Sequence, residues 1–528
     1  MPKNNEARLV RASKYFELPN KGLESYFDIV RAGQPDVYRT TFAGKDTSVD
    51  TVLSEWMPTL EAISEKWPTL WEFENDLAKK VGPMSVMKPL KQRMDDIESY
   101  YEDILLSSTP INPRANLAVI SEFEKIRGLE LRGAKATVDR MKLSTNSGSP
   151  YFTKRRIVRS KTMPILGIHV QGKDVIQMLH DGTSVWEACA VLGWRGQEGG
   201  PLPSDVKQRV VWMFPFAVNI EELRCYQPLI EASQRFNLVP AWVSMDAVDE
   251  RITKLFDSKG RNDLIVCTDF TRFDQHFNSD LQNAAKTIIT ALLNNAMPAV
   301  DWIKEVFPIK YMIPMMYDFG KVKKGFHGMG SGSGGTNVDE TLVHRALQYE
   351  AAIERGQRLN PNSMCLGDDG ILTYQGINIE DIHYSYSRHG LEMNLDKQYA
   401  SDKDCTYLRR WHHRDYRQNG VCVGVYSTCR AIGRLCEQER YYDPEIWSAK
   451  MVALRQLSIL ENVKWHPLRE QFAQFCMKRD KYRLGVDIPG FLDQIELEAK
   501  IAMDYMPDFL GYTKSQQREV GISQWWIV

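Results

Sequence analysis

Two adjacent aspartates stand between two glycines in the string Gly367-Asp368-Asp369-Gly370, with apolar residues on both sides at 364–366 and 371–372. This pattern predicts two short strands joined by a tight turn. Adjacent carboxylates repel each other, so a turn that displays both is costly unless a cation lies between them. The string alone also fits ordinary turn chemistry, and its meaning therefore depends on partners elsewhere in the chain.

The chain has 528 residues, a formal net charge of −1 and nine cysteines. Such a length predicts two to four subdomains of roughly 100–200 residues each. An odd number of cysteines spread over a long chain argues against a disulfide scaffold and favours a reducing compartment. No segment has the apolar length of a membrane span, and the first residues lack the apolar core of a signal peptide, so we expect no membrane partner.

Positive charge is concentrated between residues 132 and 161. Such a segment suits a polyanionic partner, although a solvated charged face explains it equally well. The basic residues are Arg132, Lys135, Arg140, Lys142, Lys154, Arg155, Arg156, Arg159 and Lys161, against the single acid Asp139.

The spacing of apolar residues predicts an α+β chain in which an antiparallel sheet carries helices on one face. We expect long loops at 144–150, 193–203 and 323–335, and a helix-rich region beyond residue 441. Helices are predicted at 51–63, 90–105, 281–296, 336–355 and 379–389, a buried strand at 263–269 and a short strand ending at Leu395.

An acidic partner for the turn follows the predicted strand at 263–269. Asp269 would stand at the strand end, and Asp274 five positions later could face the same cleft. Two Mg²⁺ ions about 3.5–4 Å apart need carboxylates from separate elements, which Asp269 and Asp368 could supply with Asp369 as a third ligand. A helix N-cap would explain Asp269 alone, but it would not require a second acidic turn.

Glycines dominate residues 330–335, directly before the helix predicted to begin at Thr336. Glycines let a backbone approach a ligand closely, and the positive end of the following helix would favour an anion. A flexible linker has the same composition, but linkers seldom run straight into a well-patterned helix.

Basic and apolar residues alternate over 206–213. On a strand, Lys207 and Arg209 would point to one face. Two cations on one side of a ribbon suit a triphosphate, and the alternative is an edge strand with solvated cations.

In this order the segments resemble the motifs of viral RNA-dependent RNA polymerases, most closely those of the small double-stranded RNA viruses of the picobirnavirus–partitivirus kind. The resemblance covers about residues 144–407. It adds a template-entry loop at Ser147-Gly148-Ser149-Pro150-Tyr151, a lysine-bearing element at Asn394-Leu395-Asp396-Lys397 and a hairpin near 407–411.

The resemblance implies a right-hand architecture of fingers, palm and thumb, closed by contacts between fingers and thumb. Residues 1–110 would bridge fingers and thumb. The fingers would take 111–260 with an insertion at 286–328, the palm 261–285 and 329–425, and the thumb with a C-terminal tail 426–528.

The resemblance also implies roles for single residues. Asp269 and Asp368 would bind two Mg²⁺ or Mn²⁺ ions with help from Asp369, and Lys397 would be a candidate general acid near the leaving pyrophosphate. The nucleotide would be held by Lys207, Arg209, Asp274, Ser331, Thr336 and Asn337, with Asp274 bonding the ribose 2′-OH. The template would be bound by Ser147, Gly148, Lys154, Arg155 and Arg156.

One position departs from the family pattern, which places an asparagine four residues after the threonine. Here that position is Glu340, and asparagine stands at 337. In a helix, residues 336 and 340 share a face, whereas 337 is rotated by about 100°. The ribose-selecting position is therefore open between Asn337, Asp339 and Glu340.

The implied function is template-directed RNA synthesis that replicates and transcribes a viral, double-stranded RNA genome. Partners would be template and product RNA, nucleoside triphosphates and viral capsid protein, for a monomer working in the virion interior or host cytoplasm. A two-metal nuclease, a reverse transcriptase and a structural RNA-binding protein are the alternatives. Trp525 and Trp526 would form either a stacking platform for a first nucleotide or a docked tail.

Overall fold

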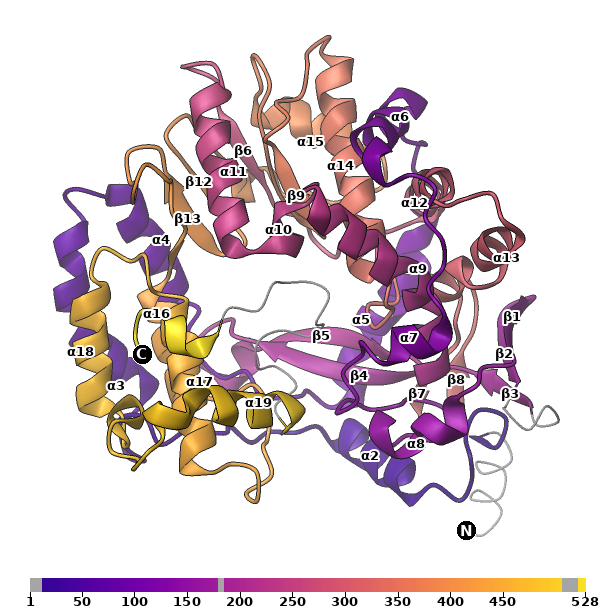
Figure 1. Cartoon of the computed structure of the whole chain (residues 1–528), viewed down its shortest axis with the longest axis horizontal. Helices are drawn as coiled ribbons and strands as arrows, with labels where there is room; N and C mark the ends of the chain where they lie inside the picture. The colour runs from indigo at the N-terminus through magenta and orange to yellow at the C-terminus, as the bar shows by residue number, and fades with distance from the viewer. Residues whose placement is uncertain (1–11, 179–184, 506–520) are drawn as a thin grey trace.

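The computed structural model describes residues 12–178, 185–505 and 521–528, whose helices and strands form a ring (Figure 1). The N-terminal helices are α2 (Lys21–Ala32), α3 (Val49–Leu60), α4 (Pro68–Ala78) and α5 (Leu90–Glu102). Next come α6 (Pro113–Glu122), α7 (Ala134–Val138), α8 (Arg155–Thr162), β1 (Gly167–Gln171), β2 (Asp174–Met178), β3 (Val185–Ala188), β4 (Ala190–Gln197), β5 (Lys207–Met213), α9 (Phe216–Arg235), α10 (Pro240–Val243) and α11 (Met245–Ser258).

The second half of the chain holds the remaining elements. They are β6 (Ile265–Thr268), α12 (Ser279–Leu292), α13 (Met297–Glu305), β7 (Met315–Asp318), β8 (Lys321–Lys323), α14 (Thr336–Glu354), β9 (Met364–Leu366), β10 (Asp369–Leu372), α15 (Ile379–Ser387), β11 (Tyr399–Ser401), β12 (Asp404–Tyr407), β13 (Arg410–His413) and β14 (Val425–Tyr426). The last helices are α16 (Thr428–Cys436), α17 (Ala449–Glu461), α18 (Arg469–Arg479) and α19 (Ile495–Tyr505).

The central sheet has the strand order β11-β6-β10-β9 and is antiparallel. All four residues of β6 are buried. Val266 packs in the same core as Leu342 of α14, whereas Ile265 packs with Val248 of α11. Because alternate side chains of a strand point to opposite faces, helices must cover both faces of this sheet. The prediction of helices on one face was therefore wrong, and the continuous apolar run of β6 is the sequence signal of a strand buried on both sides.

A second sheet, β5-β4-β7-β8, crosses the ring below the first (Figure 1). Strand β4 contains Gly193–Gln197, so the loop predicted at 193–203 was wrong in its first part. The glycines serve close packing rather than a turn, since a Cβ on Gly196 would lie 2.0 Å from the carbonyl oxygen of Met84. Glycine inside a strand often marks such a backbone approach.

The short strand predicted to end at Leu395 is instead a 3-10 helix, Leu395–Lys397. The Asn394 side chain accepts a hydrogen bond of 3.0 Å from the backbone N–H of Asp396. Such local side-chain bonding competes with a strand ladder, and the strand begins only at β11.

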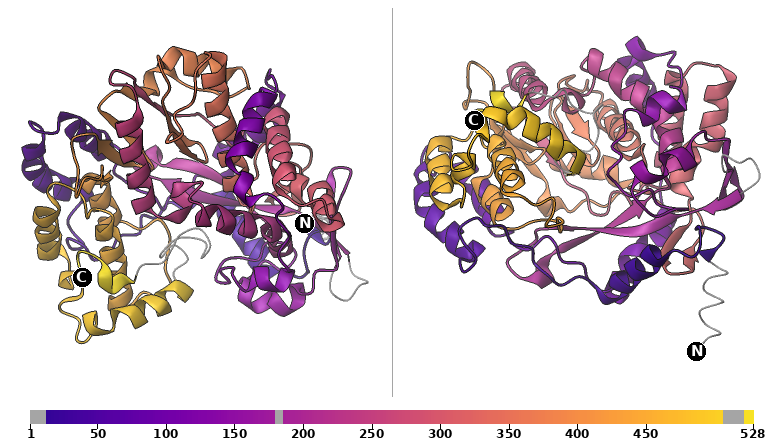
Figure 2. Two further views of the ribbon diagram at one scale, coloured as in Figure 1. Left: turned by 45° about the horizontal axis from the view of Figure 1, so that its top comes forward. Right: turned by 60° about the horizontal axis from the view of Figure 1, so that its bottom comes forward.

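The N-terminal region lies on both sides of the ring (Figures 1 and 2). Helices α2 and α5 pack against the sheet that contains β5 and β7, whereas α3 and α4 pack against α16. Glu74 of α4 is fully buried and accepts hydrogen bonds from the backbone N–H groups of Thr428 (2.8 Å) and Cys429 (3.2 Å). These bonds satisfy free N–H groups at the start of α16.

Ion pairs join β4 to the region after β14. Arg195 pairs with Glu439, and Arg430 of α16 pairs with Glu198 next to β4. Two helices of the predicted fingers segment 111–260 pack against elements of the predicted palm. Helix α6 packs against α14, and α11 lies on the central sheet. Among the residues that the structure describes, no helix is both long and apolar enough to span a membrane.

The two C-terminal tryptophans pack against the last helices. Trp525 is buried in the core formed by α3, α16 and α17, and the Trp526 indole N–H donates a 3.1 Å bond to the carbonyl of Leu460. Of the two arrangements predicted for these tryptophans, this packing corresponds to the docked tail.

Candidate active site

The acidic string forms the predicted hairpin between β9 and β10. Helix α14 holds its turn, because the Gly367 N–H donates to Thr341 Oγ1 (2.9 Å) and the Gly367 carbonyl accepts from His344 Nδ1 (2.8 Å). Gly367 has φ +57°, which favours glycine. A Cβ on Gly370 would lie 2.6 Å from His344 Cε1, so this second glycine serves close packing.

Strand register brings the acids from the two elements together. Gly370 pairs with Thr268 in the antiparallel ladder, and extending the register by one residue sets Asp369 opposite Asp269. The Asp368 side chain is exposed to solvent, but desolvation by the surrounding chain, followed by the charge of Asp274, raises its pKa. Burial, followed by the charge of Asp368, raises the pKa of Asp369 to about 7.

The sequence did not single out Gln398, which fixes Asp269. Its side-chain oxygen accepts from the Asp269 N–H (2.8 Å), and its side-chain nitrogen donates to the Asp269 carbonyl (2.8 Å). Gln398 is buried beside the predicted Lys397 element. A lone glutamine carries no motif, so only the fold reveals this contact.

The carboxylates suit divalent ions that are held partly by the protein and partly by the substrate. Within residues 12–178, 185–505 and 521–528, no three His, Cys, Asp or Glu side chains form a preassembled metal cage. Carboxylate oxygens are the donors that Mg²⁺ prefers, and Mg²⁺ is usually held by one or two carboxylates together with substrate phosphates. The mutual repulsion of Asp269, Asp368 and Asp369 is the kind that a bound cation relieves.

Two cations, Lys207 and Arg209, lie near these acids. Lys207 and Arg209 are exposed on the same face of β5, as predicted, and Arg209 donates to the Gln197 side chain (2.7 Å). The charge of Arg209 offsets part of the rise in the pKa of Asp368. Partial desolvation, followed by the charges of Lys80 and Lys397, lowers the pKa of Lys207, so the exposed Lys397 lies near Lys207.

The glycine-rich segment is a tightly packed loop rather than a linker. A Cβ on Gly332 would lie 1.5 Å from the Trp212 carbonyl oxygen, and one on Gly335 would lie 2.3 Å from the Tyr226 ring. Ser331 Oγ donates to the Val210 carbonyl (3.2 Å). The loop therefore lies against β5, the strand that carries the two cations.

Buried Glu222 holds this loop from below, and the sequence did not indicate it. Its carboxylate accepts from Ser333 Oγ, from the Gly334 N–H (3.2 Å) and from Asn219 Nδ2 (3.1 Å). Asn219 Nδ2 also donates to the Gly332 carbonyl (3.2 Å). Thr336 uses its hydroxyl within the loop and donates to the Gly330 carbonyl (3.2 Å).

Asn337 and Glu340 point to different neighbours. The Asn337 side-chain oxygen accepts from the Trp242 indole N–H (2.7 Å). Glu340 is buried beside Asp274, and burial together with the charge of Asp274 raises the pKa of Glu340 well above its usual range. Glu340, not Asn337, therefore lies next to Asp274, the residue predicted to bond the ribose 2′-OH.

The predicted template residues fall into two groups. Ser147 is buried, and a Cβ on Gly148 would lie 2.6 Å from the Phe214 carbonyl oxygen. Arg155 Nη2 donates to Asn219 Oδ1 (2.8 Å), and burial lowers the pKa of Arg155 to about 10. Only Lys154 and Arg156 expose their side chains to solvent.

Comparison with known proteins identifies the family. The model of the family described as viral RNA-dependent RNA polymerase matches residues 76–466. The chain belongs to this family. It is 60% identical over 524 residues to a "Potential RNA-dependent RNA polymerase" of Human picobirnavirus (strain Human/Thailand/Hy005102/-), covering 98% of this chain and 97% of that protein.

Solved structures agree. The crystal structure of the RNA-dependent RNA polymerase of a human picobirnavirus matches with a TM-score of 0.93 and 59% identity over 98% of both chains. An insertion loop deletion mutant of a human picobirnavirus polymerase matches with a TM-score of 0.91 and 60% identity, covering 94% of this chain and 97% of that one.

These matches confirm the predicted right-hand polymerase fold and the predicted activity, RNA-directed RNA synthesis. The nuclease, reverse transcriptase and structural RNA-binding alternatives are thereby set aside. Template RNA and nucleoside triphosphates follow as the substrates of this activity.

Proposed function

We propose that Asp269 and Asp368 hold two divalent ions, Mg²⁺ or Mn²⁺, with Asp369 as an assisting ligand. The observation that carries this proposal is the register of β6 and β10, with Asp369 opposite Asp269 and Asp368 in the adjoining turn. Two such ions would lower the pKa of the 3′-OH of the growing strand and neutralise charge on the pyrophosphate. The protein itself contributes positioning and electrostatics.

Lys207 and Arg209 hold the triphosphate of the incoming nucleotide. Their shared face on β5 and the effect of Arg209 on Asp368 support this role. Lys397 donates a proton to the leaving pyrophosphate as a general acid, which its proximity to Lys207 supports.

Asp274 accepts a hydrogen bond from the ribose 2′-OH, and Glu340 keeps its carboxyl in place. Asn337 is engaged with Trp242, so we assign the ribose-selecting position to Glu340. Ser331 and Thr336 shape the loop that receives the nucleotide and template.

Lys154 and Arg156 bind the template backbone with their exposed cations. Ser147 and Gly148 form the template-entry loop through their packing, and Arg155 fixes that loop through Asn219.

The remaining expectations extend to the biological setting. We propose that the enzyme replicates and transcribes a double-stranded RNA genome as a monomer, with viral capsid protein as a partner, in the virion interior or host cytoplasm. The similarity to picobirnavirus polymerases supports this setting. The packing of α2–α5 on both sides of the ring supports a bridging role for the N-terminal region.

Extension of a homopolymer RNA template with Mg²⁺ or Mn²⁺, using ribo- and deoxynucleotides in parallel, tests the metal assignment. Asp269→Ala and Asp368→Ala should abolish incorporation, whereas Asp301→Ala, an exposed aspartate on α13, should not. Wild-type incorporation by either active-site variant would refute the assignment.

A further inference from the structure

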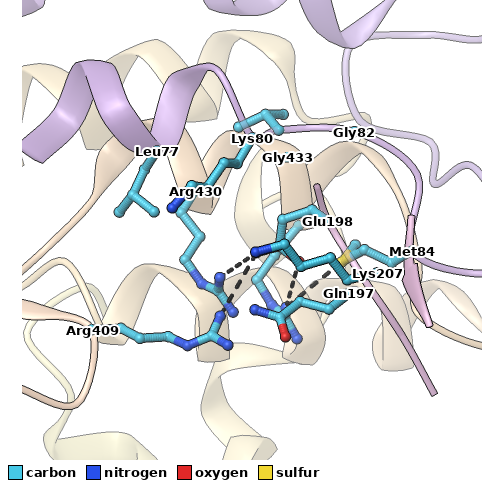
Figure 3. Close-up of a pocket in the computed structure, with 12 residues that line it drawn as sticks. Leu77, Lys80, Gly82, Met84, Gln197, Glu198, Lys207, Arg409, Arg430 and Gly433 are labelled. Carbon is cyan, nitrogen blue, oxygen red and sulfur yellow. Dashed lines mark hydrogen bonds and ion pairs between the residues drawn. The ribbon is translucent and has the colours of Figure 1, made fainter. Parts of the chain in front are cut away.

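A cavity of about 190 Å³ lies beside the catalytic acids, where four parts of the chain meet. Its walls come from the end of α4, the ends of β4 and β5, the turn after β12, and α16 (Figure 3). Pockets for whole drug-sized ligands occupy roughly 300–1,000 Å³. This cavity is therefore the size for a fragment such as a phosphate chain rather than for a complete nucleotide.

The side chains of the cavity are strongly cationic. Lys80, Lys207, Arg409, Arg430 and Arg434 line it, against one lining acid among the described residues, Glu198. Arg430 pairs with Glu198, and Arg434 lies 3.9 Å from it. These two arginines therefore have a structural partner.

The other three cations lack such compensation. In the part of the chain that the structure describes, Lys80 and Lys207 form no ion pair with a carboxylate, and the single pair of Arg409 spans 4.0 Å to Glu198. Figure 3 shows Arg409 reaching toward the centre of the cavity. Like charges held together are costly unless an anion joins them, and three cations around a small cavity suit a ligand with several negative charges.

Arg409 also belongs to a strained turn that touches the active site. Leu408 and Arg409 connect β12 to β13, with φ values of 51° and 60°. Two successive positive φ values are typical of Asn-Gly turns, so Leu and Arg here store strain of the kind found at functional sites. The Leu408 N–H donates a 2.8 Å hydrogen bond to Asp369 Oδ2.

We propose that this cavity binds a polyphosphate chain, that of an incoming nucleoside triphosphate or of departing pyrophosphate, and that the Leu408–Arg409 turn transmits its occupancy to Asp369. An anion on the Arg409 guanidinium would fix the turn, and the turn would fix the Asp369 carboxylate through the Leu408 N–H. Arg409 is thus a positioning residue for Asp369. This step rests on the proposed role of Asp369, and polyphosphate binding in the cavity extends the proposed role of Lys207 to Lys80 and Arg409.

Direct binding separates the two claims. Tripolyphosphate, which has no base or sugar, is titrated by calorimetry into the full-length protein in the presence of EDTA. Lys80→Ala should weaken binding about tenfold or more, because one charge-assisted contact is lost. Lys79→Ala removes the neighbouring exposed lysine outside the cavity and should leave the affinity unchanged. Equal affinity of wild type and Lys80→Ala, or no binding at all, overturns the site.

Kinetics then distinguish the source of the polyphosphate. If the cavity receives incoming nucleotides, Lys80→Ala raises the KM for nucleoside triphosphate and leaves inhibition by pyrophosphate unchanged. If it holds the product, the inhibition constant of pyrophosphate rises and the KM stays constant. No change in either parameter, despite lost tripolyphosphate binding, would remove the cavity from the reaction.

The link to Asp369 is tested at Arg409. Arg409→Ala should raise the concentration of Mn²⁺ needed for half-maximal incorporation, and Arg409→Lys, which restores the cation, should recover most of the loss. Equal metal requirements in wild type and Arg409→Ala would overturn the link even if tripolyphosphate binding survives. Should Asp369→Ala retain wild-type incorporation, the role of Asp369 fails, and the binding result still stands.

Discussion

The side-chain amide of Gln398 hydrogen-bonds both backbone polar groups of Asp269, each at 2.8 Å. It also donates to the Asn394 carbonyl at 2.8 Å. The acid at the end of β6 is therefore tied to the element that carries Lys397. The buried Gln398 side chain therefore helps to position both Asp269 and the segment that carries Lys397.

Gln398→Ala should lower kcat of primed extension about 10–100-fold, since loss of a residue that orients a ligand has effects of this size. The KM for nucleotide should change little, because the side-chain hydrogen bonds of Gln398 go to Asp269 and Asn394 and not to Lys207 or Arg209. Gln357→Ala, a substitution away from the site, serves as the control. An unchanged kcat would show that the sheet alone suffices to place Asp269.

The raised pKa of Asp369 predicts a pH-dependent stability in the absence of metal. The folded-state pKa is about 7, above the value of about 3.9 in an unfolded chain. The folded state therefore binds the proton more readily, and it gains stability as pH falls from above 7 toward about 4. Asp369→Asn should stabilise the metal-free protein at pH 8 by on the order of 1–3 kcal/mol.

Thermal unfolding in EDTA at pH 8 and at pH 5 measures this effect. The gain from Asp369→Asn should be larger at pH 8, where the wild-type carboxylate is charged. A gain of equal size at both pH values would mean that the charge of Asp369 is not its cause.

Glu340 should control sugar selection through Asp274. Glu340→Gln keeps the size and a hydrogen-bond donor beside Asp274, so it should retain the preference for ribonucleotides. Glu340→Ala should reduce that preference about tenfold, the effect of losing roughly 1.4 kcal/mol of discrimination. The ratio of kcat/KM for a ribonucleotide and its deoxy analogue measures it, and the idea fails if Asn337→Ala has the larger effect.

The three consecutive cations Lys154, Arg155 and Arg156 should behave differently. Lys154→Ala and Arg156→Ala should weaken template binding. Each should also reduce, by about one, the slope of the logarithm of the binding constant against the logarithm of the salt concentration. Arg155→Ala should instead lower the unfolding temperature, because Asn219 loses a buried partner. Filter binding at several salt concentrations and thermal unfolding separate the two effects, with Lys304→Ala as an exposed control.

The docked C-terminal tail should contribute to folding rather than to initiation. Removing residues 521–528 exposes the core that Trp525 covers, so the unfolding temperature should fall. Primed extension and unprimed initiation should decline together. A selective loss of unprimed initiation would instead identify the tail as a priming platform.

Local patterns predicted the parts of the site that are local in the chain. The turn at Asp368 follows from two glycines between apolar residues, and the shared face of Lys207 and Arg209 follows from strand alternation. Gln398 and Glu222 act through single contacts with distant backbone groups, and no spacing announces such contacts. Gly196 resembled a loop residue because its packing partner, Met84, lies far away in sequence.

Glu74 completes the start of α16 from a position more than 350 residues earlier in the chain. During synthesis, α3 and α4 therefore emerge long before the helix that they cover. Their apolar faces stay without a partner until the chain beyond Cys429 has been made, a period in which exposed surface favours misassembly. The ring can close only after α16 has been made, so fragments that end before Thr428, or that begin after α4, should aggregate rather than fold.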